Sequence, residues 1–212
     1  MEGLLSPFLD QYEKLKLELM SKNNFKITTL GPVGTSSNCA ALFLIDELSK
    51  VNSKCYYSIE LKDTFKEVFE QLKNNETYYA LVPTAYERIT DFFWYKDFSN
   101  VLNFIYETPE YGIISREDFV FSKSKDLKMA SCPAVENIVN YLGRDIKKNF
   151  NIKLIKTFST TEAAKFVASG ISDIGVTNES SYEVYKEKGI KFITPKYSAK
   201  ILWAIFKNNN VN

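Results

Sequence analysis

The sequence contains no histidine among its 212 residues. This absence excludes Ser-His-Asp and Cys-His nucleophilic machinery and histidine-ligated metal sites, and it removes the commonest general acid–base group. Any chemistry carried out by this chain must therefore use hydroxyl, amide, carboxylate, tyrosine, lysine or arginine groups.

Cysteine is scarce as well. Cys39, Cys55 and Cys132 are odd in number and widely spaced, and no CxxC pair is present. This pattern is typical of free thiols in a reducing compartment. We therefore expect a cytoplasmic protein without structural disulfide bonds.

The chain also lacks an excess of charge and a long apolar run. Its net charge is +1, with Lys and Glu interspersed, so a phosphate-neutralising surface of the kind found in nucleic-acid binders is not supported. No apolar run approaches the roughly 18 residues of a membrane span. Charged residues interrupt every apolar stretch of residues 1–22, which excludes a secretory signal. We expect neither nucleic acid nor a membrane as partner.

Residues 1–22 are predicted to form an amphipathic helix, with Ser6 as its cap and Pro7 at its first position. Its apolar face would consist of Phe8, Tyr12, Leu15 and Leu19. Such a face can pack against the body of the protein or against a second subunit, so a homodimer is one expected arrangement. Peripheral membrane contact is the weaker alternative, because acidic residues lie among the lysines.

From residue 24 onward, short apolar runs alternate with helical patterns. This alternation predicts an α/β protein with largely parallel strands and helices on both faces. Two lobes fit the pattern better than one sheet of about ten strands. We predict lobe 1 over residues 23–105 and 198–212 and lobe 2 over residues 106–197. Ligands in such folds bind outside the carboxyl ends of the strands, often between domains, so we expect a ligand cleft between the lobes.

Five predicted junctions between a strand and a helix share one chemistry. They are residues 31–37, 82–85, 131–134, 159–161 and 177–180. Each places Ser, Thr or Asn where backbone N–H groups are unpaired and the helix dipole is positive, an environment that binds anions without lysine. The alternative is that these residues only cap their helices. The Gly31-x-x-Gly34 spacing matches neither a dinucleotide fingerprint nor a Walker loop, so a small polyanion such as a dicarboxylate fits better than a nucleotide.

The segment from Thr29 to Ser37, Thr-Leu-Gly-Pro-Val-Gly-Thr-Ser-Ser, resembles the prephenate dehydratase family, whose opening strand and loop read Leu-Gly-Pro-x-Gly-Thr-x-Ser. The resemblance continues at residues 79–83, at Cys132-Pro133 and at residues 159–164, and it covers about residues 25–206. Four segments look closer to the family's prephenate decarboxylases of the bacilysin-pathway type. They are residues 61–65, 82–86, 108–112 and 172–179.

This resemblance implies a two-lobed, periplasmic-binding-protein-like (type II) fold and an enzyme that needs no cofactor. The implied activity is a carboxy-lyase reaction that converts prephenate to a non-aromatic hydroxycyclohexadienyl pyruvate for natural-product, and specifically antibiotic, biosynthesis. Two alternatives stay open. One is a prephenate dehydratase that forms phenylpyruvate, and the other is a non-catalytic protein that binds a small ligand with the same two lobes.

The expected site combines the resemblance with the chemistry of the junctions, and it includes no metal ligand. The catalytic candidates are Thr84, Tyr86 and Asn178. The candidates for substrate binding are Gly34, Thr35, Ser36, Ser37, Tyr111, Arg116, Ser131, Cys132, Ser159, Thr160, Thr161 and Glu179. Arg116 is expected to bind the pyruvyl carboxylate with two hydrogen bonds, with a surface ion pair as the alternative. The proton donor is water, Tyr86, Tyr111 or Glu179; the two tyrosines can instead form an apolar wall.

Three departures from the relatives bear on proton transfer. Relatives commonly carry His-Pro where this chain has Cys132-Pro133, and the decarboxylase branch has His at the position of Thr84. Dehydratases end their catalytic region with Thr-Arg-Phe on a strand, whereas the comparable strand here carries Leu202-Trp203, which resembles a Ser-Trp-type segment of the decarboxylases. Without that Thr and without histidine, protonation of the ring hydroxyl of prephenate should be slow, so the non-aromatic product is expected.

Overall fold

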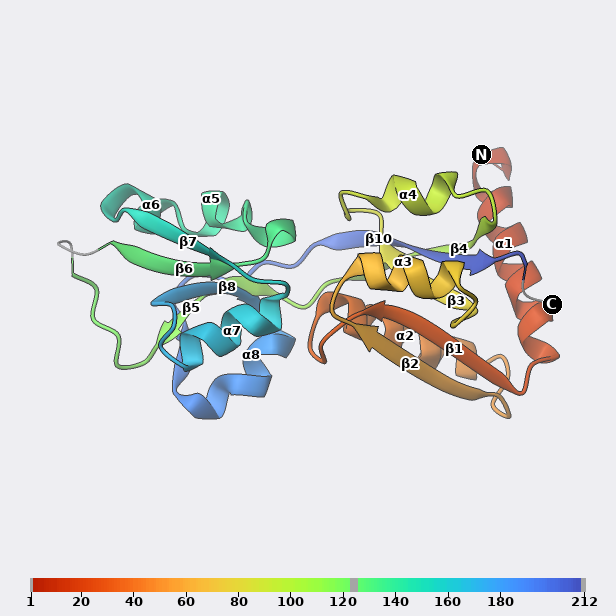
Figure 1. Ribbon diagram of the computed structural model, residues 1–212, viewed down its shortest axis with the longest axis horizontal. Coiled ribbons are helices and arrows are strands. Elements are labelled where there is room, and N and C mark those ends of the chain that lie inside the picture. The colour runs from red at the N-terminus through yellow and green to blue at the C-terminus, as the bar shows by residue number, and fades with distance from the viewer. Residues whose placement is uncertain (1, 123–125, 211–212) are drawn as a thin grey trace. The chain divides into compact units, whose positions relative to one another are not determined.

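The computed structural model describes residues 2–122 and 126–210, and the chain divides into two compact units (Figure 1). Unit 1 comprises the chain up to Gly31, then Ser37–Glu107 and the chain from Lys200; unit 2 comprises Pro32–Ser36 and Thr108–Ala199. The predicted two-lobed α/β architecture is confirmed. In this division residues 32–36 belong to unit 2 and the N-terminal helix belongs to unit 1, and the predicted domain bounds stay a prediction. Residues 1, 211 and 212, which end the predicted ranges, lie outside the described residues.

The sheet of unit 1 has the strand order β2-β1-β3-β10-β4 within the described part of the chain. Its members are β1 (Asn24–Leu30), β2 (Tyr56–Lys62), β3 (Tyr79–Pro83), β4 (Phe98–Glu107) and β10 (Lys200–Asn208). The first three strands are parallel, and β10 runs antiparallel to both β3 and β4. Because β10 pairs with the middle of this sheet, the last strand of the chain completes the unit in which the chain began.

The helices of unit 1 cover both faces of this sheet (Figure 1). They are α1 (Glu2–Met20), α2 (Ser36–Ser49), α3 (Phe65–Lys73) and α4 (Ile89–Trp94). Residues of α1 and α2 pack with Ile27 and Trp203 on one face, whereas α3 and α4 pack with Phe206 in an aromatic-rich core on the other. The alternation of side chains along each strand supplies both cores from the same strands.

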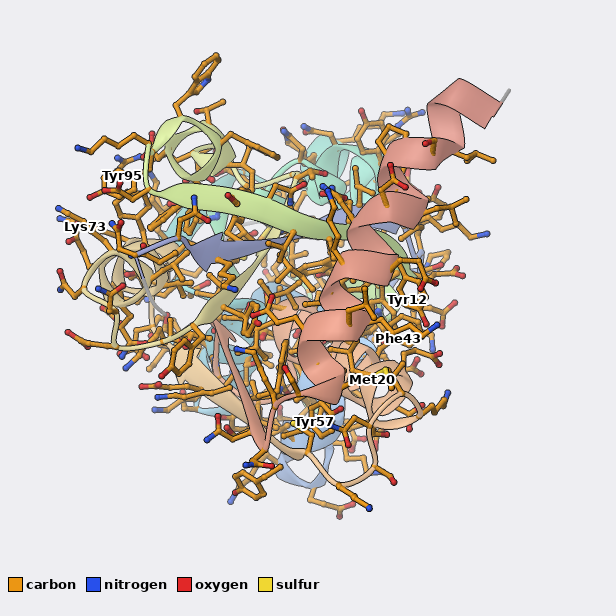
Figure 2. All side chains as sticks on the ribbon, turned by 90° about the vertical axis from the view of Figure 1, so that its right-hand side faces the viewer. Tyr12, Met20, Phe43, Tyr57, Lys73 and Tyr95 are labelled. Atoms are coloured by element: carbon orange, nitrogen blue, oxygen red, sulfur yellow. The ribbon has the colours of Figure 1, made fainter. Side chains whose placement is uncertain are left out.

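Helix α1 begins at Glu2, so the prediction of Ser6 as its cap was wrong and Pro7 lies inside the helix. Only half of its predicted apolar face is covered. Leu15 and Leu19 are 2% and 0% exposed, whereas Phe8 and Tyr12 are 46% and 40% exposed. Figure 2 shows Tyr12 on α1. The carboxyl-terminal half of α1 is therefore part of the core of unit 1, and the other half presents apolar side chains at the surface.

Unit 2 has the strand order β7-β6-β8-β5-β9 among its described residues. The strands are β5 (Tyr111–Arg116), β6 (Leu127–Ser131), β7 (Ile152–Lys156), β8 (Ile174–Asn178) and β9 (Ile190–Phe192). The helices are η1 (Pro133–Val135), α5 (Ile138–Leu142), α6 (Arg144–Asn149), α7 (Thr160–Ala168), α8 (Glu179–Tyr185) and η2 (Lys186–Lys188). Strands β6, β7 and β8 are parallel, and β5 is antiparallel to β8.

Two packing features bring polar residues to the carboxyl end of β8. A Cβ at Gly175 would lie 2.8 Å from Val167 Cγ2 and 3.2 Å from the Ala163 carbonyl oxygen, so the glycine lets α7 pack directly on β8. In the ladder of β5 and β8, Tyr111 pairs with Asn178. Because β5 runs in the opposite direction, its first residue lies beside the last residue of β8.

Two of the five predicted helix starts are different structures. The chain after β3 forms turns, and α4 begins only at Ile89. The Thr84 backbone N–H and hydroxyl both donate to the Leu202 carbonyl, each at 2.9 Å, which holds this turn on β10. Cys132-Pro133 leads into a 3₁₀ helix of three residues. Within the described residues, no helix is both long and apolar enough to cross a membrane.

Candidate functional site

Unit 2 brings together side chains and backbone groups from four separate stretches of sequence. They come from the loop at residues 32–36, the start of β5, the start of α7 and the junction of β8 with α8. We call this set the polar cluster; it consists of Gly34, Ser36, Tyr111, Thr160, Thr161, Asn178 and Ser181. Six of these seven residues were predicted from the sequence, and all seven carry hydroxyl, amide or backbone groups without formal charge.

Asn178 links three parts of the cluster. It is fully buried and caps α8, since its Oδ1 accepts a hydrogen bond from the Ser181 backbone N–H at 2.7 Å. Its Nδ2 lies 3.4 Å from Ser36 Oγ and 3.5 Å from Thr160 Oγ1, as a donor to both. The cap of one helix therefore also contacts the first residues of two others.

Ser181 lies at the centre of the cluster and was missed by the sequence prediction. Its side chain is 0% exposed. Its Oγ lies 2.8 Å from Thr161 Oγ1, 3.2 Å from Thr160 Oγ1 and 3.1 Å from the carbonyl oxygen of Gly34. The Asn-x-x-Ser spacing of residues 178–181 is the sequence signal that could have identified it, because the cap and the third helical residue meet at a helix start.

Gly34 lets the loop lie directly on the start of α8. Its φ is 90°, and a Cβ there would lie 3.1 Å from the Ser180 carbonyl oxygen and 3.3 Å from Ser181 Cα. Both the left-handed backbone and the close approach exclude a larger side chain. The loop and the first turn of α8 are thus in direct contact.

Ser36 and Tyr111 form the accessible end of the cluster. Their hydroxyl oxygens are 2.5 Å apart, and both residues are half-buried, whereas Thr160, Thr161, Asn178 and Ser181 are buried. Tyr111 is held by the ladder with Asn178 and by two backbone hydrogen bonds to Tyr197, at 2.7 and 2.8 Å. A ligand would therefore meet these two hydroxyl groups before the buried members.

Ser159 is the N-cap of α7. Its Oγ accepts a hydrogen bond from the Glu162 N–H at 3.1 Å, and Glu162 Oε2 accepts one from the Phe158 N–H at 2.7 Å. This is a capping box. The contacts of Ser159 are those of a helix cap, which is the alternative to anion binding that the sequence left open.

Ser131 and Cys132 lie at the end of β6 and are buried. The Ser131 hydroxyl donates to the Cys132 carbonyl at 3.3 Å. Burial raises the pKa of the Cys132 thiol to about 11. The thiol is therefore protonated at neutral pH, and Cys132 can act as a small neutral side chain but not as a nucleophile.

Arg116 is not part of the polar cluster, and its predicted role in substrate binding stays a prediction. It ends β5 and lies five residues from Tyr111, roughly 17 Å at about 3.4 Å per residue. Its guanidinium lies 3.3 Å from Asp118 and 3.4 Å from the Val167 carbonyl oxygen. The antiparallel direction of β5 places its two ends at opposite edges of the sheet, so Tyr111 and Arg116 cannot both lie beside Asn178.

Glu179 is paired with a lysine. Lys196 Nζ lies 2.7 Å from Glu179 Oε1 and 2.8 Å from Glu110 Oε2. Hydrogen bonds to Glu110 and Glu179 raise the pKa of Lys196, so the lysine stays charged. The Glu179 carboxylate is therefore engaged in an ion pair with Lys196.

Thr35 is buried beside the polar cluster, and its N–H donates to the Pro32 carbonyl at 3.3 Å. Ser37, Thr84 and Tyr86 belong to unit 1. The Tyr86 ring packs on Phe65 with 4.6 Å between centroids, and burial raises the pKa of its phenol. Among the described residues, no group of three or more Cys, Asp or Glu side chains could hold a metal ion.

Comparisons with known proteins show close relatives. No family model matches the chain. It is 34% identical over 191 residues to a protein named prephenate decarboxylase from Bacillus amyloliquefaciens, with 88% of each sequence covered. A protein of the same name from Planktothrix agardhii (strain NIVA-CYA 126/8) is 32% identical over 185 residues, which covers 85% of this chain and 86% of the relative.

Solved structures are similar in fold. A prephenate dehydratase in complex with L-Phe from Arthrobacter aurescens has a TM-score of 0.56 at 13% identity, covering 86% of this chain and 60% of that one. An ancestral arginine-binding protein bound to arginine has a TM-score of 0.52 at 15% identity, covering 90% of this chain and 86% of that one. These similarities confirm the predicted periplasmic-binding-protein-like fold.

Proposed function

The chain belongs to the prephenate decarboxylase family, and from this premise we propose that it decarboxylates prephenate to a non-aromatic hydroxycyclohexadienyl pyruvate without a cofactor. The observation that carries the proposal is the 34% identity to a prephenate decarboxylase over 88% of both sequences. The polar cluster of unit 2 supports the assignment of the site, because it offers hydroxyl and amide groups.

Prephenate carries a ring carboxylate, a pyruvyl carboxylate and a ring hydroxyl. When the ring carboxylate leaves as CO₂, the electron pair of the broken carbon–carbon bond moves into the ring. If hydroxide leaves, the ring becomes aromatic and phenylpyruvate forms. If a double bond shifts and a ring carbon takes a proton, the hydroxyl stays and the product is non-aromatic. The nature and position of the proton donor therefore decide the outcome.

Tyr111 is the proton donor that we propose for the ring carbon. Its hydroxyl lies at the accessible end of the polar cluster and 2.5 Å from Ser36 Oγ. A phenol is a weak acid. It can protonate an electron-rich ring carbon, but it assists the departure of hydroxide poorly. This difference favours the non-aromatic product.

Ser36 is proposed to contact a substrate carboxylate. It is the first residue of α2, a helix of 14 residues, and the first N–H groups of a helix have no intrahelical partner. Such a helix start favours a bound anion. Asn178 would hold the Ser36 hydroxyl through its Nδ2. The roles predicted for Thr35, Ser37, Thr84, Tyr86, Ser131 and Cys132, and the cleft between the lobes, stay predictions.

The direct test is identification by NMR of the product formed from prephenate at neutral pH or above. We expect release of CO₂, a product without aromatic ring protons, and full activity in EDTA. An enzyme-free control accounts for spontaneous aromatisation. Aromatic protons of phenylpyruvate as the main signal would show a dehydratase, and a thermal shift with intact prephenate and no CO₂ would show a binding protein.

The finer parts of the assignment are proposals of the same kind. A reducing, cytoplasmic location is supported by the three free cysteines. A homodimer is supported by the exposed Phe8 and Tyr12 on α1, and sedimentation of the purified chain tests it. A role in antibiotic-type natural-product biosynthesis is supported by the expected non-aromatic product, which phenylalanine synthesis does not need.

A further inference from the structure

We propose that Ser181 is a positioning residue for the decarboxylation, because it holds the loop at residues 32–36 on α8 and thereby places Ser36 against Tyr111. This inference rests on the proposed function. Ser181 does not reach the accessible end of the cluster itself, since it is fully buried. Its effect on a substrate would pass through the groups that it binds.

Two backbone groups determine which atoms donate around Ser181. The Gly34 carbonyl oxygen, 3.1 Å from Ser181 Oγ, can only accept, so the Ser181 hydroxyl proton is directed at it. The Ser181 N–H can only donate, so Asn178 presents its Oδ1 to it. Asn178 must then direct its Nδ2 toward Ser36 and Thr160.

The donor and acceptor roles of the remaining hydroxyl groups follow from these two assignments. Once its proton is used, Ser181 Oγ can only accept from Thr160 and Thr161, at 3.2 and 2.8 Å. Thr161 has one further acceptor, the Val33 carbonyl oxygen at 3.3 Å, which also belongs to the loop. The Thr161 hydroxyl proton is thus directed at Ser181 or at the loop, and the Thr160 hydroxyl can donate to Ser181. The threonines would support the loop, whereas the sequence prediction had them bind the substrate.

The Ser181 side chain joins the start of α8 directly to the backbone of the loop. A Cβ at Gly34 would lie 3.3 Å from Ser181 Cα, a tight contact at a residue with positive φ, and the glycine contributes only backbone. Ser181 Oγ then supplies the hydrogen bond that joins the two backbones. Two residues further along the loop is Ser36, the partner of Tyr111. Without the hydrogen bond from Ser181 to the Gly34 carbonyl, Ser36 could move away from Tyr111.

The test compares Ser181→Ala with Ser115→Ala. Ser115 provides a matched control, because it is also buried in unit 2 and also donates its hydroxyl to a carbonyl, that of Arg116 at 3.1 Å, but lies outside the polar cluster. Ser181→Cys, which keeps a weak donor of similar size, serves as the second variant and should be intermediate, and it carries the test if Ser181→Ala does not fold.

Kinetics with prephenate and amide hydrogen exchange of residues 33–38 are the two measurements. We expect Ser181→Ala to raise KM by about tenfold while kcat changes less than about threefold, and to speed exchange in this segment. Ser115→Ala should resemble the wild type in both. Wild-type KM and wild-type exchange in a folded Ser181→Ala would overturn the inference. If the wild type fails to decarboxylate prephenate, the proposed function fails, and the exchange data still decide whether Ser181 holds the loop.

Discussion

The helix starts at Thr64 in unit 1 and at Asn178 in unit 2 use the same local chemistry with different consequences. Thr64 Oγ1 accepts a hydrogen bond from the Glu67 N–H at 3.2 Å, and the contact is exposed. Asn178 caps α8 in the same way, but it is fully buried and its amide nitrogen reaches Ser36 and Thr160. A cap becomes part of a network only when its remaining polar atoms face other polar groups rather than water.

The largest effect is expected from Tyr111→Phe, which removes the proposed proton donor from the network of unit 2. A general acid typically contributes about 10²-fold or more, so we expect kcat with prephenate to fall by at least about 100-fold. Tyr197→Phe is the control, because Tyr197 contacts Tyr111 through backbone atoms and its ring is 68% exposed. Unchanged kcat in Tyr111→Phe would remove this tyrosine from the chemistry.

The second prediction compares the two caps directly through Asn178→Ala and Thr64→Ala. Each variant loses a helix cap. Thr64→Ala should therefore lower the free energy of unfolding by about 1 kcal/mol, and Asn178→Ala should lower it by about 1 to 2 kcal/mol. Only Asn178→Ala should also lower kcat/KM for prephenate, by about tenfold. Thermal unfolding and steady-state kinetics on both variants measure this. Equal kinetics in the two would mean that Asn178 is a cap and nothing more.

The third prediction concerns ion pairs. Ion pairs of Glu18 hold α1 in unit 1, whereas the polar cluster of unit 2 contains no charged side chain. Burial alone would raise the pKa of Glu18, but hydrogen bonds from Lys207 at 2.6 Å, Tyr79 at 2.7 Å and Lys22 outweigh it and lower the pKa. A carboxyl whose folded pKa is lowered stabilises the protein above its unfolded pKa, near 4.5, and loses that contribution as pH falls through the folded value.

Glu18→Gln should therefore cost about 1 kcal/mol at pH 7 and progressively less below pH 4.5. Urea unfolding at pH 7 and pH 3 measures both values. Glu13→Gln is a suitable control, because Glu13 pairs only with Lys16 on the same exposed helix turn. A constant difference between Glu18→Gln and the wild type at the two pH values would contradict the assigned ion pairs.

The smallest effect is expected from Arg116→Ala. Arg116 lies at the opposite end of β5 from Tyr111 and contacts Asp118 and backbone carbonyls. We expect KM for prephenate within about twofold of the wild type, since no contact with the polar cluster is lost. A KM that rises tenfold would support the carboxylate-binding role that the sequence prediction assigned to Arg116.

Local patterns predicted much of the fold and part of the site. The alternation of apolar runs and helical patterns identified two α/β lobes, and three of the five helix starts carry α-helices at α2, α7 and α8. The starts after Val82 and Ser131 were wrong, because a proline after a strand permits turns and 3₁₀ helices as readily as an α-helix. In the first case, the carbonyl of Leu202 on a distant strand holds the turn.

The sequence by itself determined the family and the two-lobed fold and predicted a site made of hydroxyl and amide groups, because these depend on residue types and on spacing along the chain. Only the tertiary structure decided which of those groups meet. The direction of β5 brings Tyr111, and not Arg116, beside Asn178. Ser181 lies next to Gly34 across 147 positions of sequence. A hydrogen bond needs two atoms within about 3.5 Å, and over such separations that distance is set by strand pairing and helix packing.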